Sequence, residues 1–380
     1  MGGCFEGMHQ ESLNFEASDR VGQSVRCAWT DILGKVSLYR AELMAMAMIG
    51  ILFTHFKAAP DSFIVRRLML FGQGGVDMFF FLSGFGLYYS SLKHSSPLCF
   101  YKRRLLRIFP AFILVLFISL LAKPVFSWRA FLWGSTTLPF WLPSIRKYTF
   151  GWYVSVIMLL YAIFPAYISF FRKGKHWCTG ISVAMALGGV AIYAHYFLHL
   201  HPGAYNQYIL CLARLPIFFL GIYAGSQSVG PRFTEADWGG KVFWIVLPLA
   251  AATLWNVGLT LWGFMPMRNS GLLYLLFCPI LPGLMLIMTW GFGWLKRRVW
   301  LNCSVGWMLR QMGTCTLEAY LLLGITYRYV NPVAHSLGIT PFWANVVLAI
   351  ATILCAWLLH RGLEIIPSWV TAWAAKRKDR

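Results

Sequence analysis

A histidine and an aspartate stand where they could move a proton. His55 closes the apolar run Ile51–Phe56, and an imidazole gains and loses a proton near neutral pH, which suits a general base. Asp77 opens the next apolar run, after Gly-Gly-Val. If the two runs form an antiparallel helix pair, these ends meet and the carboxylate could fix the tautomer of the imidazole. The alternatives are an inert interfacial histidine and an acidic helix start favoured by the helix dipole.

A basic run follows the second apolar stretch and could bind phosphate. Arg104 and Arg107 lie within Lys102–Arg107, three residues apart, so they share one face of a helix. Two guanidinium groups on one face can bind a phosphate through paired hydrogen bonds. The alternative is a basic cluster that contacts lipid headgroups at the end of a membrane helix.

Three further polar residues lie inside apolar stretches, where polar groups are costly and therefore often functional. Arg214 is either a functional cation or a side chain that extends to the membrane interface. Glu318 is expected on the opposite side of the membrane from Arg214, so no pair is predicted. Ser83, beside Gly84, favours close helix packing, and a donor near it could stabilise an oxyanion.

The elements that carry these residues are membrane helices. The chain has 380 residues, of which 58% are hydrophobic and only 12% are charged. A soluble domain carries about 25% charged residues. The excess of 33 Lys and Arg over 13 Asp and Glu is attributed to cytoplasmic loops, which are rich in basic residues, and not to nucleic-acid binding.

Several classes of site are excluded by spacing. The nine cysteines include no Cys-x-x-Cys pair, so neither a disulfide framework nor a zinc site is expected. The sequence also lacks a Walker lysine, an HExxH motif and a GxSxG motif, which excludes the corresponding nucleotidases, zinc proteases and serine hydrolases.

The hydropathy pattern predicts an all-α polytopic membrane protein with about ten transmembrane helices. A span needs about 20 apolar residues, and most Lys and Arg residues fall in alternate loops, so both termini are expected to be cytoplasmic. We expect a cytoplasmic tail over 1–37, one membrane domain over 38–365 and a basic cytoplasmic tail over 366–380. The ten predicted spans are 39–57, 75–92, 109–124, 150–171, 178–199, 207–225, 242–262, 271–293, 310–330 and 342–362.

Taken in order, the motifs on these helices resemble the acyltransferase-3 family of bacterial membrane acyltransferases. The resemblance covers about residues 38–362. Its stronger elements are Arg40-Ala-Glu-Leu-Met with His55, the run Gly75–Phe85, and Arg103–Arg107 leading into Pro110. The weaker elements are Trp152-Tyr153, Arg214–Gly221 and Thr316–Tyr320, which includes Glu318.

The resemblance implies an enzyme of the bacterial cytoplasmic membrane that takes an acyl group, commonly acetyl, from acyl-CoA. The acceptor would be a hydroxyl of an envelope or exported glycan, or a lipid-linked sugar, and acyl-CoA would be a co-substrate with no bound cofactor or metal. The essential histidine of the family corresponds to His55. Arg104 and Arg107 correspond to its donor-binding arginines, and Trp152, Tyr153, Arg214, Glu318 and Ser83 are expected to support the site.

The sequence departs from the family pattern at a few positions. Met44 stands where a basic residue is frequent, and Arg40, one turn earlier, is expected to replace it. Ile157 and Met158 replace frequent glutamates, and Leu323 replaces a frequent histidine. These differences affect the expected acceptor more than the chemistry.

The predicted reaction is direct transfer, in which His55 deprotonates the acceptor hydroxyl and Asp77 orients the imidazole. His55 lies about 22 Å beyond Arg40 along a helix, so the arm of a cytoplasmic donor must enter a cavity between helices. The main rival is a flippase or transporter of a lipid-linked glycan. Two others are a membrane O-acyltransferase of different architecture and a scaffold without enzymatic activity.

Overall fold

The computed structural model describes residues 27–56, 63–93, 96–200, 208–228, 238–261, 263, 271–298, 301–337 and 341–378. The secondary structure over these ranges is helical, without a strand. The first 26 residues of the predicted tail lie outside the described residues. The rest of that tail belongs to helix α2 (Cys27–Leu38).

Seven helices in the described part of the chain are long and apolar enough to cross a membrane. This confirms a polytopic membrane protein, while the predicted count of ten and the side of the termini stay predictions. The other three predicted stretches are also helical, but the first and ninth are not among the seven and the seventh contributes only a shorter apolar helix, Ala250–Leu261. The seven spans are Val65–Lys93, Pro97–Leu121, Trp152–Phe171, Lys175–Tyr193, Tyr208–Gln227, Leu272–Arg297 and Phe342–Glu364.

Three helices form the centre of the bundle: α3 (Arg40–Thr54), α5 (Gly74–Lys93) and α11 (Leu215–Gln227). Helix α5 is buried along most of its length. Its contact with α11 is close because Gly84 faces the carbonyl of Phe218, and a Cβ there would collide with it. Small residues at a helix crossing let two backbones approach in this way. The predicted packing role of the Ser83–Gly84 segment is therefore confirmed for the glycine.

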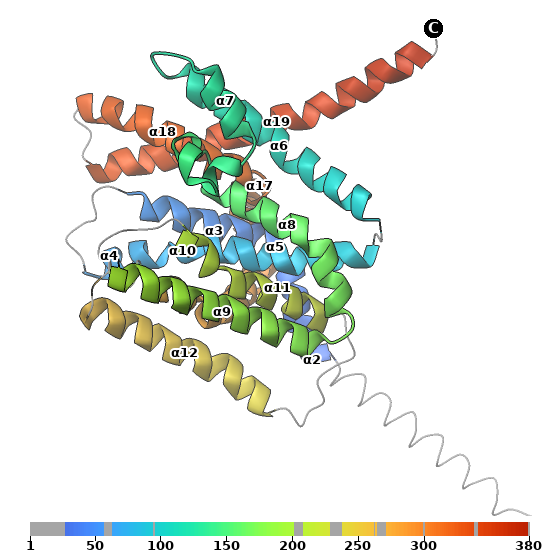
Figure 1. Ribbon diagram of the computed structural model, residues 1–380, viewed down its shortest axis with the longest axis vertical. Coiled ribbons are helices and arrows are strands. Elements are labelled where there is room, and N and C mark those ends of the chain that lie inside the picture. The colour runs from blue at the N-terminus through green and yellow to red at the C-terminus, as the bar shows by residue number, and fades with distance from the viewer. Residues whose placement is uncertain are drawn as a thin grey trace, which may run out of the picture.

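Further helices cover this centre on both sides (Figure 1). Helices α9 (Lys175–Leu200) and α12 (Trp238–Leu261) lie on one side. On the other side lie α6 (Pro97–Leu121), α18 (Thr316–Ser336) and α19 (Pro341–Lys378). Helix α19 continues as one helix past the predicted boundary at residue 366 (Figure 1).

The remaining helices complete the bundle and its connections. Helix α8 carries the Trp-Tyr motif at its first turn and packs near α5 and α6. The bounds are α4 (Phe63–Phe71), α7 (Trp128–Ser135), η1 (Leu138–Phe140), η2 (Pro143–Tyr148), α8 (Trp152–Phe171), α10 (Tyr208–Leu212), α14 (Leu272–Leu275), α15 (Phe277–Arg297), η3 (Asn302–Gly306) and α17 (Trp307–Thr314).

Candidate functional site

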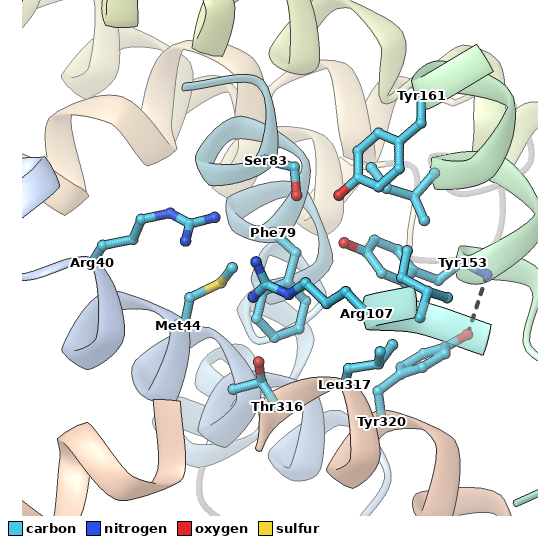
Figure 2. Close-up of a pocket in the computed structure, with 12 residues that line it drawn as sticks. Arg40, Met44, Phe79, Ser83, Arg107, Tyr153, Tyr161, Thr316, Leu317 and Tyr320 are labelled. Carbon is cyan, nitrogen blue, oxygen red and sulfur yellow. Dashed lines mark hydrogen bonds between the residues drawn. The ribbon is translucent and has the colours of Figure 1, made fainter. Parts of the chain in front are cut away.

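Two guanidinium groups enter a pocket of about 60 Å³ between α3, α5, α6, α8 and α18. Figure 2 shows Arg40 and Arg107 approaching from opposite sides, with their guanidinium groups directed toward the middle. The hydroxyl groups of Ser83 and Thr316 also line this space. We call it the arginine pocket. Its lining is Arg40, Met44, Phe79, Ser83, Arg107, Ile108, Tyr153, Ile157, Tyr161, Thr316, Leu317 and Tyr320.

Arg40 is held across α5 by one hydrogen bond and one glycine. Its Nη2 donates to the carbonyl oxygen of Leu82 at 3.3 Å. The guanidinium lies against Gly86, where a Cβ would come within 3.2 Å of Nη2. The first turn of α3 and the absence of a side chain at residue 86 therefore place this cation beside the pocket.

The two arginines of α6 take different positions. Arg107 lines the pocket, whereas Arg104 stacks over the rings of Phe100 and Tyr161, 5.5 and 5.4 Å from their centroids. Tyr161 itself lines the pocket, so Arg104 lies one ring behind the wall. Arg104 and Arg107 share one face of α6, as predicted, but only Arg107 lines the pocket.

No carboxylate among the described residues compensates the positive charges of these three arginines, because none forms an ion pair with Arg40, Arg104 or Arg107. Guanidinium groups without an internal partner are suited to bind phosphate or carboxylate groups of a ligand. The charge and the donor type of the arginine pocket are therefore suited to an anionic ligand.

A larger cavity of about 660 Å³ lies toward the other end of α3. We call it the histidine cavity. Its polar side chains include those of His55, Gln73 and Arg214, so it can hold a ligand with hydroxyl groups. The lining is Ile51, Thr54, His55, Gln73, Val76, Thr149, Phe150, Gly151, Trp152, Leu210, Arg214, Tyr274, Tyr320, Leu321, Leu323, Gly324 and Tyr327.

The imidazole of His55 is oriented by its own helix. It follows the last residue of α3, and its Nδ1 lies 2.8 Å from the carbonyl oxygen of Ile51 and 3.2 Å from Oγ1 of Thr54. Because a carbonyl oxygen can only accept, Nδ1 must carry the proton in this hydrogen bond. In the neutral imidazole Nε2 is then the unprotonated nitrogen, and it has no hydrogen bond among the described residues. That tautomer is the one that a general base at Nε2 requires.

Asp77 does not contact His55, which corrects the expectation that it orients the imidazole. Its Oδ1 forms an ion pair with Nε of Arg214 at 3.4 Å. The reason is the direction of α5: Gly75 faces the carbonyl of Ala47 on α3, and Asp77 lies about 200° further around the helix. The carboxylate therefore points away from the helix that carries His55.

The ion pair is deeply buried and Arg214 is enclosed by aromatic rings. The side chains of Asp77 and Arg214 are 0% and 3% exposed. The guanidinium carbon lies 3.9 Å from the ring centroid of Tyr274 and 5.2 Å from that of Trp152, which favours a cation at this place. Arg214 is thus a cation of the histidine cavity that is neutralised inside the protein and does not extend to the interface.

The Trp-Tyr motif at the start of α8 joins the two spaces. Its N-cap is Gly151 with φ of +64°, a left-handed conformation that favours glycine. Trp152 lines the histidine cavity and Tyr153 lines the arginine pocket. The backbone N–H of Tyr153 donates to the hydroxyl of Tyr320 at 3.3 Å, drawn as a dashed line in Figure 2.

The last two predicted supporting residues lie in different places. Ser83 lines the arginine pocket and is not part of the wall of the histidine cavity, so the predicted oxyanion donor near Ser83 is not beside His55. Oε1 of Glu318 lies 2.8 Å from Nδ1 of His360 on α19. Glu318 lines neither space and is not paired with Arg214, in agreement with the expectation.

Sequence reasoning assigned no role to several residues of these walls. Tyr320 lines both spaces, although its segment was noticed only as a weak motif. Tyr161, Gln73 and Tyr274 are also wall residues. Aromatic residues in apolar runs carry no signal that separates a cavity wall from ordinary packing, so the tyrosines could not be singled out.

Residues 43–361 match the family model for the acyltransferase domain, acyltransferase-3. The chain belongs to the acyltransferase-3 family. The match confirms the resemblance and shows a membrane acyltransferase. It spans every wall residue of the arginine pocket and the histidine cavity except Arg40. No curated protein and no solved structure matches the chain significantly.

Proposed function

We propose that this acyltransferase moves an acyl group, most simply acetyl, from acyl-CoA to a hydroxyl of a cell-envelope or exported glycan. The observation that carries the proposal is the meeting of two spaces at Tyr320. One has uncompensated guanidinium groups and the other contains an imidazole with an available Nε2. An anionic donor and a hydroxyl acceptor need these two environments close to each other.

The donor would be held by its phosphates. Arg40 and Arg107 provide donors directed into the arginine pocket, and Arg104 adds charge behind Tyr161. The uncharged pantetheine arm would extend from there toward the histidine cavity. The 15 residues of α3 that separate the two ends correspond to about 22 Å, so an extended arm is required.

The transfer step uses the tautomer of His55 in which Nδ1 carries the proton and donates it to the carbonyl oxygen of Ile51. Nε2 takes the proton of the acceptor hydroxyl while that oxygen attacks the thioester carbonyl, so a C–O bond forms. The tetrahedral intermediate then breaks its C–S bond, and the leaving thiolate takes the proton from Nε2. The ester and free coenzyme A are the products, and Asp77 has no part in the step.

The test measures free coenzyme A and acylated product with purified protein in nanodiscs, supplied with acetyl-CoA and candidate glycans. His55→Ala should lower the rate by about 100- to 10,000-fold, as for loss of a general base. His176→Ala is the matched control, because His176 on α9 hydrogen-bonds Tyr223 on α11 and lines neither the arginine pocket nor the histidine cavity. Full activity in His55→Ala would refute the proposed role of this histidine.

A separate experiment tests the proposed acceptor and the proposed location in the cell envelope. Mass analysis of envelope glycans, in bacterial cells with and without the gene, should find one acyl substituent missing without the protein. A flippase or transporter would instead move the glycan without consuming acetyl-CoA, and glycan transport would persist in His55→Ala.

A further inference from the structure

We infer that Tyr320 is the partition between the arginine pocket and the histidine cavity, and that its side chain must move aside for the donor arm to reach His55. This inference rests on the proposed function. It gives Tyr320 the role of a positioning residue that controls when the thioester of the acyl arm reaches His55.

The position of Tyr320 is the first line of argument. It is the one residue in the walls of both spaces. Its ring packs against Tyr153 with centroids 5.4 Å apart and an interplanar angle of 63°. Tyr153 in turn packs against Phe80 at 5.1 Å. The ring of Tyr320 therefore separates the two spaces, and Tyr153 and Phe80 support it from behind.

The bonds that hold Tyr320 are weak enough to break and re-form. Its hydroxyl accepts one long hydrogen bond, 3.3 Å from the N–H of Tyr153. That N–H lies in the first turn of α8, where backbone donors have no partner within the helix. In the described part of the chain this hydrogen bond, the ring contact with Tyr153 and packing against the core hold the side chain. Unlike Arg214, Tyr320 has no charged partner that a movement of its side chain would leave unpaired.

Gly324 provides the space beside the ring. In an α-helix a side chain leans toward the N-terminus and covers the turn before it. A side chain at residue 324 would therefore cover Tyr320 from the side of the histidine cavity. Gly324 leaves this place empty: a Cβ there would meet no atom within 4 Å. The cavity reaches the ring because this glycine lies one turn after Tyr320.

A partition between the two spaces would prevent hydrolysis of the thioester. His55 can activate water as well as a sugar hydroxyl, and water would hydrolyse the thioester to acetate and free coenzyme A. In that reaction water gives its proton to Nε2, a C–O bond forms, the C–S bond breaks and the thiolate takes the proton. A closed ring keeps the thioester away from His55 when no acceptor is present.

Two substitutions test the partition in opposite directions. Tyr320→Ala removes the ring, so release of coenzyme A from acetyl-CoA alone, measured at saturating acetyl-CoA, should rise at least tenfold. The double variant with His55→Ala should return to the background rate. Gly324→Leu fills the space beside the ring, so transfer should fall at least tenfold with binding unchanged.

Gly362→Leu is the control for the second substitution. Gly362 is also a helical glycine with open space around its Cβ, and it lines neither the pocket nor the cavity. It should leave transfer unchanged. The inference is overturned if Tyr320→Ala does not raise hydrolysis and Gly324→Leu transfers like the Gly362→Leu control.

A labelling measurement separates failure of this inference from failure of the proposed function. A cysteine at Gln73, inside the histidine cavity, is treated with a membrane-impermeant maleimide confined to the face that carries Arg40, and modification is read from the mass of its peptide. Labelling should be slow with Tyr320 present and at least tenfold faster in Tyr320→Ala. Equal rates refute the partition even if transfer occurs. Faster labelling without any thioester cleavage supports the partition and refutes the proposed function.

Discussion

The buried ion pair of Asp77 and Arg214 should contribute strongly to stability as a unit. The two charged atoms are 3.4 Å apart, and at an effective dielectric constant of about 20 their attraction is about 5 kcal/mol. Much of this is offset by the loss of hydration. Removing one partner leaves the other charge buried, at a cost of about 3–5 kcal/mol, whereas removing both is close to neutral.

The measurement is a double-mutant cycle with Asp77→Asn, Arg214→Met and the double variant. Unfolding of the purified protein in detergent is followed by the fluorescence of its 18 tryptophans. We expect each single variant to be strongly destabilised and the double variant to recover, so that the coupling is at least about 3 kcal/mol. The control cycle uses Arg310 and Glu42, 3.3 Å apart, with Arg310 42% exposed. Its coupling should be smaller because solvent screens the cation.

Additive effects in the first cycle would refute this reasoning, because they would show that the carboxylate and the guanidinium do not interact. A cycle between Asp77 and His55 gives the complementary result. Strong coupling there would restore the role that the sequence suggested for Asp77, whereas the structure predicts none.

Three other predictions follow from single contacts. Arg107→Ala should weaken acetyl-CoA binding about 10- to 100-fold through the loss of about 1.5–3 kcal/mol, whereas Arg103→Ala, outside the pocket wall, should change it less than threefold in the same titration. Gly151→Ala should lower the free energy of unfolding by about 1–2 kcal/mol, because residue 151 has φ of +64°. Thr326→Val should cost about 1 kcal/mol by removing a 2.7 Å hydroxyl contact with Thr352, and this loss should be smaller when Thr352 is already valine.

The membrane fold was predictable because lipid leaves a chain few alternatives to helices. The predicted boundaries differ from the structure where charged residues lie inside a helix that continues past them. The third span was expected to begin at residue 109, but α6 begins at Pro97 and contains the basic run. Helix α19 likewise continues past 366, while the cytoplasmic location of the tail over 366–380 stays a prediction. Hydropathy marks where a helix enters lipid, whereas backbone hydrogen bonds decide where the helix ends.

The types of residue in the site were easier to predict than their partners. His55, Arg40 and Arg107 lie on cavity walls, as expected of the predicted base and donor-binding residues. The prediction that Asp77 pairs with His55 was wrong, because two residues at neighbouring helix ends can still point in different directions. The position of Gly84, seven residues after Asp77, contained the missing signal: both lie on one face of α5, and Gly84 packs against α11.

The distribution of charge along the bundle explains how a polyanionic donor could be oriented. The cations of the arginine pocket have no carboxylate partner among the described residues, so phosphates gain most there. In the histidine cavity, Asp77 cancels the charge of Arg214, which removes the attraction for a phosphate group. Under the proposed function, the phosphates would stay at the arginine end and the uncharged arm would extend past Tyr320. The same asymmetry disfavours the reverse orientation, because burying an unpaired phosphate near the neutral pair is costly.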